Sequence, residues 1–454
     1  WTINNGKLYF NTKLYTGNGA SSHAITGVGF KPDWTWNKNR SSAVNHALTD
    51  VVRAAPKKLV SNNNEAEINQ TTGLLSFNSD GFTVGSDSGY NGNGNSMVSW
   101  NWMAADPPKK TYVVKVVSDG GNKYRFDDFG TSAVTLELSE GGTFIFDQSD
   151  SSNNNHPLRF STTSNGTHAG GSIYTTGVVV SGTPGQAGAK TTITVAASAP
   201  TLYYFCTQHS GMGGQANTPV TNSFTNLDGS LQSNVSPNTI SKFSIVKWTS
   251  TDTAGSTIGH GLGAVPKMII TKKITSGNPG NWTVYHNSIG NTKSLALNTT
   301  GVEDAATSYW NNTSPTASVF STGTYFDAGD YIAYCFADVQ GYSKFGSYKG
   351  NGNANGTFNY TGFKPAFIML KNTTTAASWL MYDNKRLGYN VDNNELVANT
   401  ADDEETYDQI DILSNGFKMR ANGTSTNKSG DTFIYMAFAS NPFTSAAGTP
   451  VTAR

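Results

Sequence analysis

Four side chains at characteristic spacings could hold a copper ion. Cys206, His209 and Met212 follow one another at intervals of three residues, and His156 lies 50 residues before the cysteine. One thiolate, two imidazoles and a thioether form the ligand set of blue copper sites. The cysteine would end a strand over 202–206, with His209 and Met212 in the tight loop that follows it. A histidine from a neighbouring loop would complete the site, so the sequence predicts copper as the metal held by these four residues.

The segment around these residues resembles the cupredoxins. Their C-x2-H-x2-M loop matches Cys206, His209 and Met212, and their separate upstream histidine matches His156. The likeness spans residues 111–218 and implies a cupredoxin-like Greek-key β-sandwich with these residues as ligands. A second interpretation stays open, in which the same cluster is packed as polar scaffold in a rigid module.

Other candidate sites are weaker. The acidic run at 401–405 lacks the alternating Asp and Gly of a calcium loop, so a solvated loop is favoured. His260 and His286 have no Cys or carboxylate nearby in the sequence and are expected to be surface or structural residues. Cys335 lies in an aromatic strand and is expected to be a buried small apolar residue.

Tryptophans raise the question of sugar binding, because aromatic rings can stack on sugar rings. Trp34 and Trp36, like Trp100 and Trp102, alternate along a strand, which places each pair on one face and favours a core. The G-x-S-x-G, H-E-x-x-H and phosphate-loop patterns do not occur in the sequence. The sequence therefore gives no positive support for an enzyme, and we expect none.

The elements around these residues are organised as three repeats. Each repeat has an aromatic turn, then a Gly-x-x-Pro turn that leads into an apolar strand, and later an aromatic strand. The prolines are Pro32, Pro266 and Pro365, and the spacing from each proline to the last aromatic residue is 70, 70 and 73 positions. A basic residue closes the apolar strand each time, at Lys38, Lys272 and Lys371. Repeats 1 and 3 also share an Asp/Asn-Gly-Phe turn, at 80–82 and 415–417.

Short alternating strands bounded by Gly and Asn turns predict an all-β protein. We expect three related β-sandwich or jelly-roll-like repeats at 1–104, 239–339 and 340–445, with the cupredoxin-like domain at 111–218. The segment 104–110 reads as a stiff Pro-containing linker, and a second, loose linker is expected to run to about residue 239. Serial sandwiches of this kind would form an extended, multi-domain object.

Charge and composition exclude several classes of protein. Lys+Arg 31 equals Asp+Glu 31, so the net charge is zero, which argues against a strongly basic nucleic-acid binder. No apolar run approaches the roughly 20 residues of a membrane span. Two cysteines in 454 residues do not make a disulfide scaffold.

The repeats resemble a family of tail-fibre and other virion surface proteins of marine bacteriophages. The strings that carry this likeness are 259–270, 281–286, 309–315 and, most specifically, 332–348, which reads IAYCFADVQGYSKFGSY. The resemblance implies a non-enzymatic structural protein at a virion surface or outside the cell. Its expected partners are other virion proteins, further copies of itself in a homo-oligomer, expected to be a trimer, and a host surface glycan or protein. The alternatives are an extracellular copper-binding or electron-transfer protein with adhesive domains, and an array of carbohydrate-binding modules.

Overall fold

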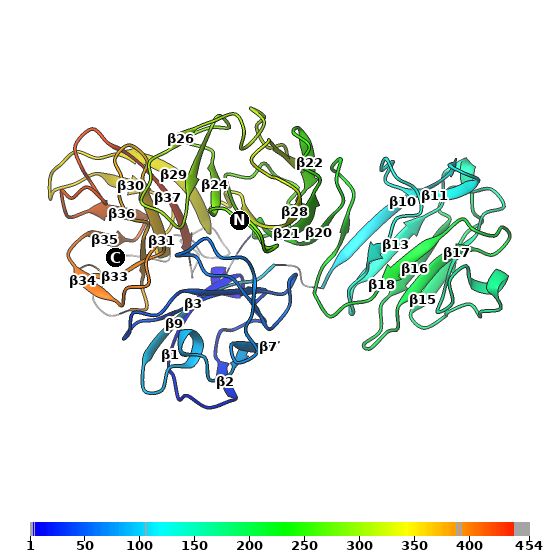
Figure 1. Ribbon diagram of the computed structural model, residues 1–454, viewed down its shortest axis with the longest axis horizontal. Helices are drawn as coiled ribbons and strands as arrows, with labels where there is room; N and C mark the ends of the chain where they lie inside the picture. Colours follow the sequence, from blue (N-terminus) through cyan, green and yellow to red (C-terminus); the bar gives the residue numbers. More distant parts are fainter. Residues whose placement is uncertain (1–2, 4, 105–106, 387–389, 391–392, 440–454) are drawn as a thin grey trace. The chain divides into compact units, whose positions relative to one another are not determined.

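The computed structural model describes residues 3, 5–104, 107–386, 390 and 393–439 (Figure 1). Residues 105 and 106 of the expected first linker, and the expected end of repeat 3 at 445, lie outside these residues. The described chain contains 37 strands, one short α-helix, α1 (Ser88–Asn91), and three 3₁₀ helices, so the all-β prediction is confirmed. The 3₁₀ helices are η1 (Gly6–Leu8), η2 (Ser151–Asn153) and η3 (Gly166–Ala169). None of the helices in this part of the chain is long and apolar enough to cross a membrane.

The chain divides into two compact units. The repeat unit comprises Trp1–Ala104, Asn238–Gly255 and Leu262–Arg454, and the inserted unit comprises Ala105–Pro237 and Ser256–Gly261. Each unit is described by itself below. The four boundaries expected from the sequence remain predictions, and we keep the names repeat 1, 2 and 3 for 1–104, 239–339 and 340–445.

Four strands recur in the same order in the sheets of the three repeats. The orders are β1-β9-β3-β4 in repeat 1, β21-β28-β23-β24 in repeat 2 and β29-β37-β31-β32 in repeat 3. The bounds of these strands are β1 (Phe10–Thr16), β9 (Ser96–Trp102), β3 (Trp34–Asn39), β4 (Ala47–Asp50), β21 (Phe243–Ser250), β28 (Gly329–Phe336), β23 (Met268–Lys273), β24 (Thr283–His286), β29 (Ser343–Lys349), β37 (Thr432–Ala439), β31 (Pro365–Asn372) and β32 (Leu380–Asp383). The apolar strand after each Gly-x-x-Pro turn pairs antiparallel with the last aromatic strand, as β3 with β9, β23 with β28 and β31 with β37.

The Asp/Asn-Gly-Phe turns of repeats 1 and 3 each connect a hairpin, β7 (Leu74–Asn78) with β8 (Gly81–Val84) and β35 (Ile410–Leu413) with β36 (Gly416–Met419). A Cβ added to Gly81 would lie 2.0 Å from the Ile25 carbonyl oxygen, and one added to Gly416 would lie 2.1 Å from that of Asn359. Glycine is therefore required because a neighbouring strand passes too close for any side chain. The other strands of the repeat unit are β2 (His23–Thr26), β5 (Lys57–Lys58), β6 (Ile68–Asn69), β7 (Leu74–Asn78), β8 (Gly81–Val84), β25 (Lys293–Ala296), β26 (Asp304–Ala305), β27 (Val319–Thr322), β30 (Phe358–Tyr360), β33 (Asn393–Val397), β34 (Glu405–Tyr407), β35 (Ile410–Leu413) and β36 (Gly416–Met419).

The three lysines, each one residue before the end of its strand (β3, β23 or β31), connect the repeats to one another. Lys38, Lys272 and Lys371 are fully buried. The Lys38 ammonium donates to the carbonyl of Ala401 in repeat 3 at 3.1 Å. The Lys272 ammonium donates to the carbonyl of Asn64 in repeat 1 at 3.1 Å. The ammonium of Lys371 donates to the carbonyl of Thr300 in repeat 2 at 3.0 Å. Each repeat thus reaches a different neighbour, and the three contacts form a closed cycle.

A backbone contact follows the same cycle two residues after each lysine. The amide of Glu404 donates to the Arg40 carbonyl at 3.0 Å. The equivalent amides of Glu67 and Glu303 donate to the carbonyls of Ile274 at 3.2 Å and Thr373 at 3.1 Å. Because side chain and backbone repeat the same connection three times, the three segments are related by an approximate threefold pattern of contacts.

One aromatic core serves all three repeats. The Trp34 ring of repeat 1 stacks on Tyr334 of repeat 2 with ring centroids 4.2 Å apart. The ring of Phe438 in repeat 3 lies 5.8 Å from Trp102 and 5.9 Å from Phe336. The expectation of an extended series of sandwiches is therefore wrong for these repeats: their aromatic sheet faces are buried against one another in one compact unit.

The inserted unit contains two further sheets. The first has the order β11-β10-β13-β16-β15 and the second β12-β18-β17-β14. Their bounds are β10 (Lys109–Ser118), β11 (Asn122–Phe126), β12 (Leu136–Glu137), β13 (Thr143–Asp147), β14 (Leu158–Ser161), β15 (Val178–Ser181), β16 (Lys190–Thr194), β17 (Leu202–Cys206) and β18 (Gly214–Asn217). Aromatic rings from both sheets meet in the core, where Phe126 lies 5.0 Å from Tyr204 and Phe146 lies 5.4 Å from Phe160.

The expectation of a loose linker between residue 218 and about residue 239 is wrong in part. Residues 224–226 and 233–238 form an antiparallel pair, β19 (Phe224–Asn226) and β20 (Ser233–Asn238), and a further strand is β22 (Ser256–Gly259). The Asn and Ser residues are used as hydrogen-bonding groups within this structure, as when the Ser233 hydroxyl donates to the Gly259 carbonyl at 2.7 Å. Composition alone did not distinguish such a segment from a flexible one.

Candidate functional site

Strand pairing brings two of the predicted ligands together. Cys206 is the last residue of β17, and it lies opposite Leu158, which opens β14. His156 precedes that strand by two residues and is therefore positioned next to the cysteine. The chain then turns through His209 and Met212 and returns as β18. His156, Cys206 and His209 are thus assembled at one end of the second sheet, and Met212 lies further along the same loop as His209.

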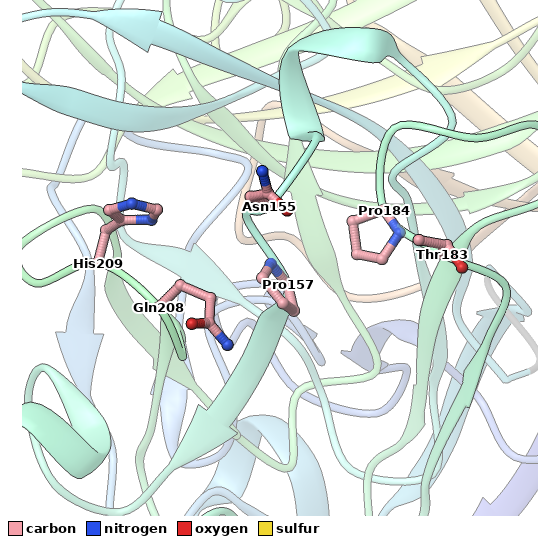
Figure 2. A pocket seen from close by; sticks show the side chains of 6 residues that line it. All are labelled: Asn155, Pro157, Thr183, Pro184, Gln208 and His209. Carbon is pink, nitrogen blue, oxygen red and sulfur yellow. The ribbon is translucent and has the colours of Figure 1, made fainter.

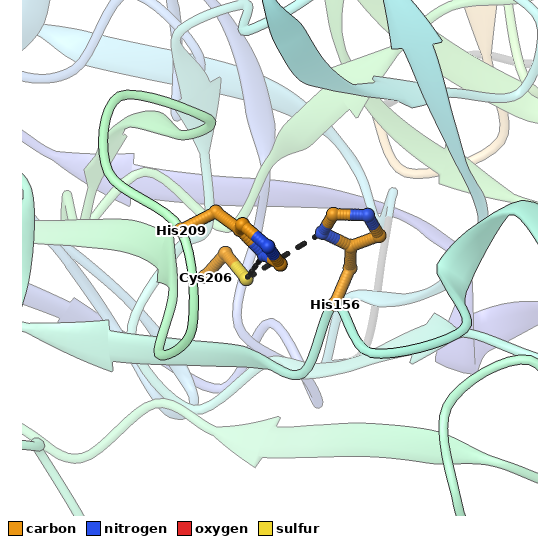
Figure 3. A group of neighbouring side chains, drawn as sticks. All are labelled: His156, Cys206 and His209. Carbon is orange, nitrogen blue, oxygen red and sulfur yellow. Dashed lines mark hydrogen bonds between the residues drawn. The ribbon is translucent and has the colours of Figure 1, made fainter.

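The three polar ligand candidates face one another (Figure 3). The Cys206 sulfur lies 3.8 Å from Nδ1 of His156 and 3.8 Å from Nδ1 of His209. The ligand atoms of these three residues all lie within 4.8 Å of one another. Met212 is buried in the same loop, with 1% of its surface exposed.

This arrangement fits a metal ion bound between sulfur and two nitrogens. Metal–sulfur bonds of roughly 2.3 Å and metal–nitrogen bonds of about 2.0–2.1 Å, at an angle of about 120°, place S and N roughly 3.8 Å apart. That is the separation found on both sides of Cys206. A trigonal His₂Cys set with a weak axial thioether is the arrangement typical of blue copper sites. His156, Cys206 and His209 therefore satisfy a distance requirement that the sequence alone could not test.

The surroundings favour the neutral form of His156. Burial, followed by the nearby His209, lowers the pKa of His156 below its usual value. A neutral imidazole leaves a nitrogen lone pair available, and metal binding requires it. Cys206 is buried, His156 is half-buried and His209 is exposed, so the site is reached from the side of His209.

A pocket of about 420 Å³ opens at this exposed side (Figure 2). Its walls are formed by Asn155, Pro157, Thr183, Pro184, Gln208 and His209. Two side-chain amides, one hydroxyl and two proline rings are among the groups that line it. The pocket gives small molecules access to the ring of one ligand candidate.

Sequence reasoning missed the residues that hold the ligand loops. The side-chain amide of Gln148 donates to the His156 carbonyl at 2.8 Å and accepts from the backbone amide of Leu158 at 3.1 Å. The Asn165 side chain donates to the Ser210 hydroxyl at 2.9 Å and accepts from the Gly211 amide at 2.8 Å.

His168 and Tyr124 hold the same loops through their carbonyls. Nε2 of His168 lies 2.9 Å from the Cys206 carbonyl oxygen, and the Tyr124 hydroxyl donates to the His156 carbonyl at 2.8 Å. These side chains act mainly through backbone atoms of distant segments, so no motif in the sequence identifies them.

The weaker candidates have structural positions. In the acidic run, Glu404 pairs with Arg40 at 2.7 Å and with Arg386 at 3.1 Å, so part of the run forms a contact between repeats. His260 and His286 are both fully buried, which agrees with a structural role. Cys335 is buried as expected, and burial raises the pKa of its thiol.

The tryptophans considered for sugar stacking lie in the core. Trp34, Trp36, Trp100 and Trp102 are each at most 1% exposed. Their rings are therefore not presented to a ligand in solution. The core interpretation of these residues is confirmed.

The comparisons with known proteins give one family. No curated protein and no solved structure matches the chain. A family model described as a domain of unknown function, DUF7483, matches residues 5–118 and 214–442. The unmatched segment between these parts contains His156, Cys206, His209 and Met212. Since the match covers more than half of the sequence and includes the repeats, the chain belongs to the DUF7483 family.

Proposed function

We propose that this protein is a non-enzymatic structural component of a bacteriophage virion surface, either a tail fibre or a decoration of the tail or capsid. The observation that carries the proposal is the closed cycle of three repeats, in which Lys38, Lys272 and Lys371 are committed to holding the repeats together. Their ammonium groups donate to backbone carbonyls of a neighbouring repeat, which is a structural role. The virion location in this proposal is supported by the resemblance of the repeat strings to virion surface proteins.

The composition suits this role. Charged residues make up 14% of the sequence, so the surface is polar mainly through Asn, Ser, Thr and backbone groups. At physiological ionic strength the Debye length is about 8 Å, so salt weakens interactions between exposed charges, most of all beyond that separation, but it weakens hydrogen bonds between neutral groups far less. This role implies three kinds of partner: other virion proteins, further copies of this chain in a trimer, and a host surface glycan or protein.

Antibody labelling of purified particles tests the virion proposal. Phage particles from cells that carry the gene would be banded on a density gradient and examined by immunogold electron microscopy. We expect gold at the tail or capsid surface and the intact chain among the particle proteins. Protein that stays in the soluble fraction, with unlabelled particles, would contradict a virion role.

We further propose that the inserted unit binds copper, because the two 3.8 Å sulfur–nitrogen distances fit a His₂Cys site. His156, Cys206 and His209 would hold the ion, with Met212 as the weak fourth ligand. Bound copper would supply one-electron redox chemistry or added stability. In this chain, burial of Cys206 would exclude water from the sulfur, while exposed His209 would connect the site to partners.

Visible and EPR spectra after addition of Cu(II) test this second proposal. We expect an intense blue absorption in the wild-type protein and in Cys335→Ala, which removes the other buried cysteine. The absorption should be absent in Cys206→Ala. A colourless wild-type protein that remains folded would mean that the cluster is scaffold.

A further inference from the structure

Exposed aromatic rings are confined to one repeat. Among the residues that the structure describes, the exposed aromatic side chains are Phe358, Tyr360 and Tyr407, and all three lie in repeat 3. Phe358 and Tyr360 belong to β30, an edge strand of the sheet β30-β36-β35. A fold that buries most of its rings leaves these two in solvent, which indicates that they contact a partner.

The two rings share the outward face of this sheet. Asn359 between them is buried, so Phe358 and Tyr360 point to the opposite side. In the neighbouring strand β36, Phe358 lies opposite Lys418 and Tyr360 lies opposite Gly416. Side chains two residues apart on a strand are separated by about 6.6 Å. The rings therefore form a short aromatic strip along the edge of the sheet.

Glycines keep the surface beside the strip flat. A Cβ added to Gly416 would lie 3.1 Å from the Phe358 ring, and one added to Gly362 would lie 3.5 Å from the Tyr360 hydroxyl. Each ring thus lies beside a residue that has no side chain. A flat strip of this kind suits a ligand that itself has a flat apolar face.

Polar groups of both signs surround the rings. The Lys418 ammonium donates to the side-chain oxygen of Asn355 at 2.5 Å. Asp411 of β35 lies opposite Lys418 and pairs with Arg420 at 3.4 Å. Because a lysine and an aspartate lie side by side on this face, it favours a neutral ligand that can accept and donate hydrogen bonds.

The corresponding face of repeat 1 carries small residues instead. Its sheet β2-β8-β7 has the same order, and the glycine of each Asp/Asn-Gly-Phe turn fixes the register between the two sheets. Counted from that glycine, Ala24 and Thr26 take the places of Phe358 and Tyr360. The fold does not require rings at these positions, so they are a feature of repeat 3 alone among these two sheets.

We propose that Phe358 and Tyr360 form a binding site for a neutral oligosaccharide, in which successive sugar units stack on the two rings. This inference rests on the virion function proposed above and assigns its host surface glycan to repeat 3. A sugar ring has a face made of C–H groups, which packs on the face of an aromatic ring. Its hydroxyls lie at the edge, where Asn355, Lys418 and Asp411 offer donors and acceptors.

A protein partner fits this face less well. Stable protein interfaces bury about 800 Å² on each side and have an apolar centre. Two rings on a three-residue strand, beside a lysine and an aspartate, provide only a small apolar area. An oligosaccharide needs no more than such a strip.

Affinity electrophoresis of the full chain tests the site. The probes are three soluble neutral polysaccharides, a β-glucan, an α-mannan and a β-galactan, each cast into a native gel and compared with a gel that contains none. We expect at least one to retard the wild-type protein. Phe358→Ala and Tyr360→Ala should each weaken this association about tenfold. Tyr360→Phe keeps the ring and should bind as the wild type does.

Tyr407→Ala is the matched control. Tyr407 is 44% exposed, as is Phe358, but it lies in β34 and donates to Glu405. This variant should be retarded as strongly as the wild type, and tryptophan fluorescence would show that all variants are folded. A wild-type protein that none of the three polysaccharides retards would overturn the proposal. Retardation that survives both alanine changes in β30, or that Tyr407→Ala weakens equally, would also overturn it.

The outcomes separate this inference from the function on which it rests. Gold-labelled particles together with a protein that no probe retards would overturn the oligosaccharide site and leave the virion function standing. Unlabelled particles together with retardation that Phe358→Ala abolishes would overturn the virion function and leave a carbohydrate-binding site.

Discussion

At the residue scale, two buried carboxylates hold equivalent positions and depend on donors from a neighbouring repeat. Asp50 of repeat 1 accepts from the Tyr334 hydroxyl of repeat 2 at 2.8 Å and from Arg53 at 2.6 Å. Asp383 of repeat 3 accepts from the Trp100 indole of repeat 1 at 3.0 Å. A buried charge is tolerated only when it is paired and hydrogen-bonded, so each aspartate needs its partner repeat in place.

Repeat 2 has His286 at the equivalent position, the last residue of β24. On β37 of repeat 3, the residue at the place of Tyr334 and Trp100 is Met436, which has no hydrogen to donate to a carboxylate. Burial lowers the pKa of His286 to about 4, so the ring is neutral at pH 7. Its Nε2 lies 3.3 Å from the Tyr435 carbonyl oxygen. The two repeats with a donor from a neighbouring repeat thus have an aspartate at this position, and repeat 2 has a neutral histidine.

Tyr334→Phe tests this dependence. The change leaves the buried Asp50 carboxylate without one of its donors, and we expect the free energy of unfolding to fall by about 1–3 kcal/mol. Denaturant titration followed by tryptophan fluorescence measures the effect. Tyr360→Phe, at a ring that is 64% exposed, is the control and should be neutral. Equal stability of the two variants would contradict a role for the hydroxyl.

At the element scale, the last residue but one of one strand in each repeat is a buried lysine. Burial lowers the pKa of Lys38, Lys272 and Lys371 to about 8 in each case. Their hydrogen bonds to carbonyls of the next repeat compensate part of the cost of burying the charge. The contacts between repeats are therefore sensitive to the protonation of three equivalent groups.

The pH dependence of stability follows from these lysines. Between about pH 8 and the unfolded value of 10.5, the folded state binds fewer protons than the unfolded state, so stability should rise with pH. We expect Lys38→Met to reduce this rise by about 1 kcal/mol between pH 8 and 9.5, measured by denaturant unfolding. Lys31→Met, at an exposed lysine, should preserve the wild-type slope. A wild-type slope in Lys38→Met would show that its charge does not oppose folding.

The elements differ in how far they could be predicted from sequence. The strands β3, β23 and β31 were predictable because a Gly-x-x-Pro turn and an apolar run are local signals. The packing of the repeats was not, because the contact of Lys38 with Ala401 joins residues 363 positions apart. At the candidate site, the Cys206 loop was visible as a motif, whereas Tyr124 contributes through hydrogen bonds that leave no pattern in the sequence.

At the scale of the whole molecule, the two units carry different optical probes. All nine tryptophans fall within the ranges of the repeat unit, and the ranges of the inserted unit contain none. The proposed copper ligands all fall in the inserted unit. The stability of each unit can therefore be followed separately in the intact chain.

Unfolding with and without copper should show this separation. A ligand that binds only the folded state stabilises it by RT ln(1 + [L]/Kd), which is about 2.7 kcal/mol at 100 times Kd. We expect Cu to raise the transition seen in the blue absorption and in tyrosine signals of the inserted unit. The tryptophan transition should move much less, and Cys206→Ala should remove the copper effect. An equal shift in both probes would indicate that the units unfold as one.

The cyclic contacts of the repeats also bear on chain connectivity. Gly6 lies against the Ala439 carbonyl so closely that a Cβ at residue 6 would collide with it, so the first and last described parts of the cycle meet. A cycle of three similar segments has no intrinsic first member. A circular permutant that joins this point with a short linker and opens at the turn around Gly341 should retain the hydrogen bonds of Lys38, Lys272 and Lys371 to the neighbouring repeats. If this permutant folds, the cyclic arrangement does not require any particular repeat to come first in the chain.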